Sequence, residues 1–174
     1  MSTLGTCGIP RPPQDITVSH PVAAKIPHPD QIKNIEQAVA AIIGVCRDDL
    51  HLPIVDPVTV HLYENSTSYA LYGYGHGVFP IDVANQVATA RAQDILIDLG
   101  KVDKARAHSI LLLAHEYGHV IHYNIAGEAR LPAFVWEGFA DWVAARVLHS
   151  LGWQDYEISV HRAQRELLRQ WAWL

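Results

Sequence analysis

The chain has 174 residues, the size of one domain with room for a buried core. Hydrophobic residues make up 49% and charged residues 18%, as in an ordinary globular protein rather than a disordered chain. The formal net charge of -5 argues against a nucleic-acid partner, which usually meets a basic surface. A membrane partner is not expected either, because no apolar run reaches the roughly 18 residues that span a bilayer.

The two cysteines, Cys7 and Cys46, form no C-x-x-C pair. Neither a disulfide framework nor a cysteine-based zinc site is therefore expected. The first residues lack the charged start and apolar block of a signal peptide. The expected compartment is the cytoplasm, and export without a leader would leave the same pattern.

Six of the ten prolines fall in residues 1–29, which are expected to form an extended N-terminal arm. Residues 30–174 are then a single domain. Asp30 is expected to cap a helix that runs to about Asp48. The predicted buried face of this helix consists of Ile32, Ile35, Val39, Ile42, Ile43 and Cys46.

The middle of the chain predicts strands and a loop. Residues 58–63 alternate and are β-branched, which indicates a strand. Residues 72–77 are rich in glycine and tyrosine and predict a loop. Residues 77–82 predict a short strand that Pro80 would confine to a sheet edge. Residues 95–99 predict another strand.

Three helices are expected to complete the chain. Asp103 can cap a helix over residues 104–126, which Gly127 would end. Pro132 suits the first turn of a helix over residues 132–150, and a last helix is predicted over residues 156–171. This order predicts an α+β fold in which helices pack on one face of a small, twisted mixed sheet.

The helix over residues 104–126 contains His-Glu-Tyr-Gly-His at residues 115–119. Histidines four residues apart share one helix face, so His115 and His119 can bind the same metal ion. Glu116 projects about a quarter-turn away, where a base that acts on a metal-bound water has to lie. A chance H-E-x-x-H has a probability of about a few per cent in a chain with 11 histidines, and its place in an apolar helix lowers that risk.

The next predicted helix carries Trp-Glu-Gly-Phe-Ala-Asp. Its Glu137 comes 18 positions after His119, and Asp141 follows one turn later on the same face. Catalytic zinc sites have three protein ligands and an open position for water, so one Zn²⁺ ion is expected on His115, His119 and Glu137. Asp141 is then placed to orient a ligand histidine, with His115 as the expected partner.

These motifs resemble the gluzincin clan of zinc metallopeptidases, to which thermolysin belongs, and are most similar to its peptidase MA-like group. The resemblance covers about residues 56–150. It implies a zincin-like domain that hydrolyses amide bonds of a peptide or protein substrate, with Glu116 as the general base. It also implies that an edge strand of the sheet binds the substrate in extended form, for which residues 77–82 are the candidate.

The chain differs from the sequence patterns of metzincins and of many gluzincins. Metzincins have a glycine three residues and a histidine six residues after the motif, where this chain has His122 and Ile125. Only about 24 residues follow Ser150, too few for the helical subdomain that supplies a transition-state tyrosine or histidine in many gluzincins. The candidates for that role are Tyr156, His161 and Arg162 in the last segment, and Tyr72, Tyr74 and His76 in the glycine-rich loop.

Five other residues have more than one interpretation. His122 is a spare ligand, a proton shuttle or a helix-surface histidine, and the last is expected because the three-ligand set is already complete. Cys7 begins a Cys-Gly-Ile-Pro sequence that resembles the cysteine switch of metzincin pro-segments, so it is a candidate latency thiol. Gly118 either allows a second helix to approach closely or is a tolerated packing glycine. Trp136 and Trp142 either line the site or fill the core behind it.

Two other functions stay open at this point. The same zinc chemistry could act on a small non-peptide substrate, since a short C-terminal region leaves a shallower cleft. Alternatively, the chain is a degenerate metal-binding module without activity, although an intact Glu116 argues against this. The sequence determines neither the oligomeric state nor the substrate preference.

Overall fold

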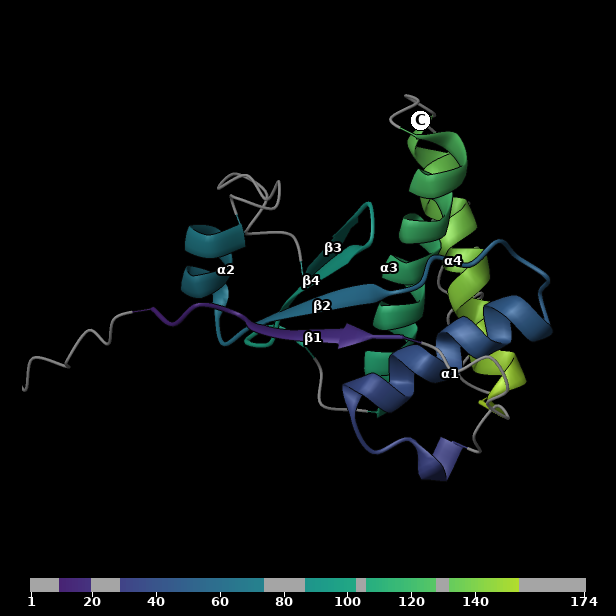
Figure 1. Ribbon diagram of the computed structural model, residues 1–174, viewed down its shortest axis with the longest axis horizontal. Coiled ribbons are helices and arrows are strands. Elements are labelled where there is room, and N and C mark those ends of the chain that lie inside the picture. The colour runs from purple at the N-terminus through teal and green to yellow at the C-terminus, as the bar shows by residue number, and fades with distance from the viewer. Residues whose placement is uncertain (1–9, 20–28, 74–86, 103–105, 128–131, 154–174) are drawn as a thin grey trace, which may run out of the picture.

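The computed structural model describes residues 10–19, 29–73, 87–102, 106–127 and 132–153. Within these ranges the fold is mixed α+β (Figure 1), and none of the helices combines the length and apolar character needed to cross a membrane. The strands are β1 (Gln14–Val18), β2 (Val58–Tyr63), β3 (Ala88–Arg91) and β4 (Asp94–Asp98). The helices are α1 (Ile35–Asp48), α2 (Ser66–Gly73), α3 (Arg106–Ala126) and α4 (Ala133–Ser150), with a short 3-10 helix at Pro29–Gln31.

The four strands form one mixed sheet in the order β1-β2-β4-β3. β2 and β4 run parallel, whereas β1 and β3 are antiparallel to their neighbours. β3 is therefore one edge of the sheet and β1 the other. The predicted strands over 58–63 and 95–99 are confirmed as β2 and β4. β1 was not predicted: Gln14–Val18 pairs with β2, so this part of the expected N-terminal arm belongs to the sheet.

A buried histidine connects β1 to the rest of the sheet. His61 of β2 is only 5% exposed. Its Nδ1 lies 2.8 Å from Oδ1 of Asp15 in β1, and its Nε2 lies 3.3 Å from Oδ1 of Asp94 in β4. When both ring nitrogens carry a proton, each donates to a carboxylate, which can only accept. One side chain thus links three neighbouring strands.

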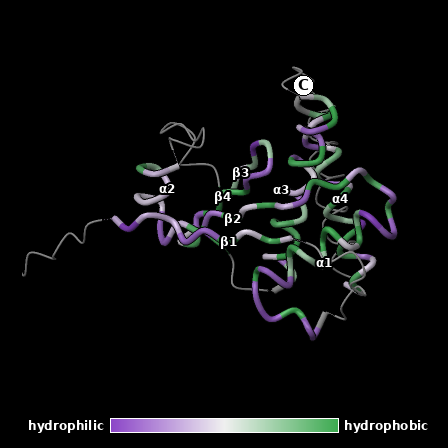
Figure 2. Tube along the Cα trace, viewed as in Figure 1, coloured by the Kyte–Doolittle hydropathy of each residue, from purple (hydrophilic) through white to green (hydrophobic). Residues whose placement is uncertain are grey.

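The main core lies between one face of the sheet and the helices α1, α3 and α4 (Figure 1). Val60 and Ile95 pack there with residues of α1 and α3, and Figure 2 shows hydrophobic residues along these helices. Cys46 of α1 is fully buried in this core, and burial raises the pKa of its thiol to about 12. The expectation that helices cover one face is confirmed for α1, α3 and α4.

α2 does not pack on the main-core face of the sheet, and it was not predicted. It occupies residues 66–73, so it includes the first two residues of the predicted glycine-rich loop. Tyr69 of α2 packs with Tyr63 of β2 and Leu96 of β4 in a second, small cluster. Because neighbouring residues of a strand point to opposite faces, this cluster lies on the face of the sheet away from the main core.

The start of α1 also differs from the prediction. The capping residue is Asn34, whose Oδ1 accepts a hydrogen bond from the backbone N–H of Gln37 at 2.8 Å. Asp30, the predicted cap, lies in the 3-10 helix instead. Residues 77–82 and 156–171, predicted as an edge strand and a last helix, lie outside the described residues.

α3 and α4 confirm the two helices predicted around the motifs. α3 ends at Ala126, and Gly127 follows with a φ of 63°, the left-handed conformation that commonly ends a helix. Pro132 immediately precedes α4 rather than occupying its first turn. Tyr117 of α3 is fully buried, and its hydroxyl accepts from the backbone N–H of Val55 and donates to the Val55 carbonyl, both at 3.1 Å. The motif helix is thereby tied to the segment before β2.

Candidate metal centre

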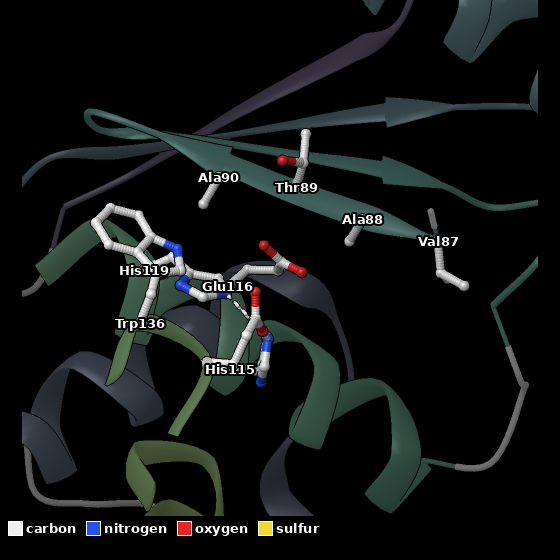
Figure 3. Close-up of a pocket in the computed structure, with 9 residues that line it drawn as sticks. Val87, Ala88, Thr89, Ala90, His115, Glu116, His119 and Trp136 are labelled. Atoms are coloured by element: carbon white, nitrogen blue, oxygen red, sulfur yellow. Dashed lines mark hydrogen bonds and ion pairs between the residues drawn. The ribbon is translucent and has the colours of Figure 1, made fainter. Parts of the chain in front are cut away.

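The predicted site residues of α3 and α4 meet beneath the edge strand β3. Figure 3 shows His115, Glu116 and His119 of α3 beside Trp136 of α4, with β3 on the other side of the pocket. Together with Glu137 and residues 87–90, they line a cavity of about 280 Å³. Segments separated by up to 50 residues in sequence therefore form one site.

The three predicted ligands present a compact triangle of donor atoms. Nε2 of His115 lies 3.1 Å from Nε2 of His119. Oε2 of Glu137 lies 3.3 Å from the first of these nitrogens and 3.5 Å from the second. Donor atoms at about 2.0–2.1 Å from a tetrahedral zinc ion are roughly 3.3 Å from one another. The separations and the chemistry of this donor set therefore fit a single ion of that size.

A glycine allows α4 to reach this position. A Cβ atom on Gly118 would lie 2.8 Å from the Cα of Ala140, closer than real Cβ atoms approach backbone. The two helices therefore touch where residue 118 has no side chain. Glu137 and Asp141 lie on either side of Ala140 in α4, so this contact determines how near both come to His115. Of the two interpretations of Gly118, the close approach is the one found.

Asp141 makes the contact that was predicted for it. Nδ1 of His115 lies 3.0 Å from Oδ1 of Asp141, which directs Nε2 toward the donor triangle. Burial by itself lowers the pKa of His115, but hydrogen bonds to Asp141 and Glu137 outweigh it and raise the pKa to about 10 when no ion is bound. Hydrogen bonds to His115 and His119 hold the pKa of Glu137 well below its usual range.

Glu116 lies beside the triangle and is not part of it. Its side chain is 5% exposed, and its Oε2 has no hydrogen-bond partner among the described residues. Burial raises the pKa of Glu116 to about 7, against the opposing charges of His115 and His119 and with the support of Glu137. A carboxyl group with a pKa near neutrality can both accept and release a proton at neutral pH.

Trp136 stacks on two histidines of α3. Its ring centroid lies 5.4 Å from that of His119 and 4.5 Å from that of His122, with interplanar angles of 18° and 28°. His122 is 8% exposed, so the prediction of a surface histidine is wrong: Trp136 and Phe139 of α4 cover it. Trp136 lines the cavity, whereas Trp142 is 44% exposed and does not.

Of the remaining candidates, the structure describes only Tyr72. Tyr72 lies in α2 and packs against the small cluster on the other face of the sheet, where its hydroxyl donates to the carbonyl of Pro10 at 3.0 Å. Tyr72 therefore does not line the cavity beside His115 and His119. The others lie outside the described residues, namely Cys7, Tyr74, His76, Tyr156, His161 and Arg162.

Sequence reasoning missed the strand that borders the cavity. β3 has four residues and becomes a strand by pairing with β4, with Thr89 opposite Leu96. The two-residue connection between them, Ala92-Gln93, has no glycine or asparagine, which hairpin turns of this length favour. Ala92 nevertheless adopts a φ of 54°. Local sequence thus carried no turn signal, and only the nearness of β4 could have indicated the strand.

Comparisons with protein-family models, with curated proteins and with solved structures found no match to this chain.

Proposed function

We propose that this chain is a zinc-dependent metallopeptidase of the gluzincin type, in which His115, His119 and Glu137 hold one Zn²⁺ ion. The observation that carries the proposal is the donor triangle, with edges of 3.1, 3.3 and 3.5 Å, beside the buried carboxyl group of Glu116. A bound zinc ion with three protein ligands supplies an open position for water, lowers the pKa of that water to about 7 and polarises a carbonyl group.

Glu116 is the general base of the proposed reaction. It takes a proton from the attacking water, whose oxygen forms a bond to the carbonyl carbon of the substrate. The C–N bond then breaks, and Glu116 returns the proton to the leaving nitrogen.

Asp141 and Glu137 have supporting roles at the proposed zinc centre. Asp141 accepts a hydrogen bond from the Nδ1–H of His115 and so keeps the other ring nitrogen available as a ligand. Glu137 is half-exposed at the start of α4 and contributes the negative charge of the ligand set. Both depend on the contact between Gly118 and Ala140 for their positions.

The edge strand β3 favours a peptide over a small molecule as the substrate. Its outer edge pairs with no other strand among the described residues, and residues 87–90 border the cavity. An extended peptide can add to such an edge by main-chain hydrogen bonds, which would hold a peptide bond over the ligand set. β3 is the described strand that would bind a substrate in extended form, and residues 77–82, the candidate from the sequence, lie outside the described residues.

Metal analysis and hydrolysis assays test the proposal. The purified protein should hold about one zinc ion per chain, cleave casein or members of a peptide library, lose activity with a chelator and regain it with zinc. Glu116→Gln should keep the zinc and lose turnover by about 10²–10⁴-fold. Glu36→Gln, at an exposed glutamate of α1, is the matched control. Zinc binding with hydrolysis of small esters or amides alone would favour the small-molecule alternative, and zinc binding without any turnover would favour the degenerate module.

A further inference from the structure

We infer that Trp136 is a positioning residue for the ligand His119, an inference that rests on the proposed zinc centre and extends it. The indole ring would orient the imidazole of His119, as the carboxylate of Asp141 orients that of His115. Stacking would thereby replace the hydrogen bond that usually orients a ligand histidine.

The two ligand histidines are held in different ways. His115 has its Nδ1 at 3.0 Å from Oδ1 of Asp141. Nδ1 of His119 is buried and has no hydrogen-bond partner among the described residues. A histidine that binds a metal ion almost always donates its other ring N–H to an acceptor, which fixes the orientation of the ring. For His119, another contact has to supply this restraint.

The flat face of Trp136 is that contact. The indole and the imidazole of His119 are nearly parallel, at 18°, with their centroids 5.4 Å apart. The ring of His115 meets the same imidazole edge-on, at 88° and 4.7 Å. The second side-chain torsion of histidine has broad energy wells, so the ring turns easily unless its faces are blocked. A stacked indole resists this rotation and keeps Nε2 of His119 in the donor triangle.

The indole is itself held by its neighbours. His122 stacks on it with a centroid distance of 4.5 Å, and Phe139 packs edge-on against His122 at 5.5 Å. His119 and His122 are three residues apart and face α4 together. Trp136 also directly precedes Glu137, so the third ligand and the ring that stacks on the second ligand come from adjacent residues of α4.

Substitutions at residue 136 separate positioning from plain packing. Trp136→Leu keeps an apolar side chain and removes the ring, whereas Trp136→Phe keeps an aromatic face. Trp142→Leu removes another tryptophan of α4, whose ring contacts Phe139. The readouts are zinc affinity by competition with a chromophoric chelator, the visible absorption spectrum of the Co²⁺-loaded protein, and the Tm of the metal-free protein.

Trp136→Leu should weaken zinc binding by about 10–100-fold, the usual effect of losing a group that orients a ligand. It should also change the Co²⁺ spectrum, because the geometry of the His119 ligand changes. Trp136→Phe should recover most of the affinity, and Trp142→Leu should bind zinc like the wild type. A lower Tm in Trp136→Leu with unchanged zinc affinity and an unchanged Co²⁺ spectrum would mean that Trp136 only packs, and would overturn the inference.

The proposed zinc centre and the role of Trp136 are overturned by different results. A wild-type protein that binds neither zinc nor Co²⁺ would overturn the proposed function and with it the role of Trp136. If the wild type binds both ions, and Trp136→Leu matches it in zinc affinity and in Co²⁺ spectrum, only the role of Trp136 is overturned. If Trp136→Leu does not fold, Trp136→Met is the second variant without a ring, and the same comparison with Trp136→Phe decides the question.

Discussion

Gly118 of α3 lies so close to Ala140 of α4 that a Cβ atom on residue 118 would be 2.8 Å from the Ala140 Cα. This contact brings α3 and α4 together beside the candidate metal centre. Glu137 and Asp141, which approach the histidines of α3, are three residues before and one residue after Ala140. Any change in the distance between the helices at this point moves both carboxylates relative to His115.

Gly118→Ala should therefore weaken zinc binding without stabilising the fold. The gain of about 1 kcal/mol in helix propensity is set against an overpacking cost of about 1–3 kcal/mol, since the atom that a new methyl group meets is backbone. We expect lower zinc affinity and a free energy of unfolding that does not rise. Urea denaturation and zinc competition measure the two effects.

Gly138→Ala is the matched control for this substitution. Gly138 lies in α4 next to Glu137, but a Cβ atom there would have nothing within 4 Å. This variant should gain up to about 1 kcal/mol of stability from helix propensity and keep its zinc affinity. Equal behaviour of the two variants would contradict the account of the helix contact.

The buried carboxyl group of Glu116 predicts a pH-dependent stability of the metal-free protein. Its pKa rises from 4.5 to about 7 on folding. Below about pH 4.5 both the folded and the unfolded chain hold the proton, and the stabilising contribution of the protonated form is complete. As the pH rises toward 7 this contribution is lost, because only the unfolded chain ionises freely.

Glu116→Gln removes this titration without removing the polar group. In the presence of a chelator, the Tm of Glu116→Gln minus that of the wild type should increase between about pH 4.5 and 7 and then level off. Differential scanning calorimetry across this range measures the difference. A Tm difference that stays constant with pH would show that Glu116 is not the group that titrates.

Tyr117→Phe should destabilise the fold by about 1–3 kcal/mol, because the N–H and the carbonyl of Val55 would both lose their partner in a partly buried place. The aromatic ring stays, so the core keeps its volume and the loss reports on the hydrogen bonds. Chemical denaturation measures the effect. A change below about 0.5 kcal/mol, as at ordinary surface positions, would argue against this anchoring of α3.

The thiol of Cys46 should be inert in the folded protein, since it is fully buried and its pKa is raised to about 12. A thiol reagent followed by peptide mapping should label Cys46 only after denaturation, and labelling in the native state would contradict its place in the core. The same experiment tests the latency hypothesis for Cys7. If Cys7 reacts equally with and without a chelator, it does not cap a metal ion.

The sequence by itself determined the features that depend on local spacing. The helical repeat places His115 and His119 on one face and Glu116 beside them, and the same repeat places Asp141 one turn after Glu137. α3, α4, β2 and β4 were predictable because each has a clear periodic pattern or clear end signals. The identity of the metal and the reaction remain predictions from these motifs.

The tertiary structure decided what depends on partners distant in the chain. β1 and β3 have weak local patterns and are strands because β2 and β4 pair with them. Packing also separated Tyr72 and Trp136, which were both aromatic candidates for the site. α2 places Tyr72 on the far face of the sheet, whereas α4 stacks Trp136 on His119. Spacing along one helix places side chains around its axis, but only the packing of two helices determines which of them meet.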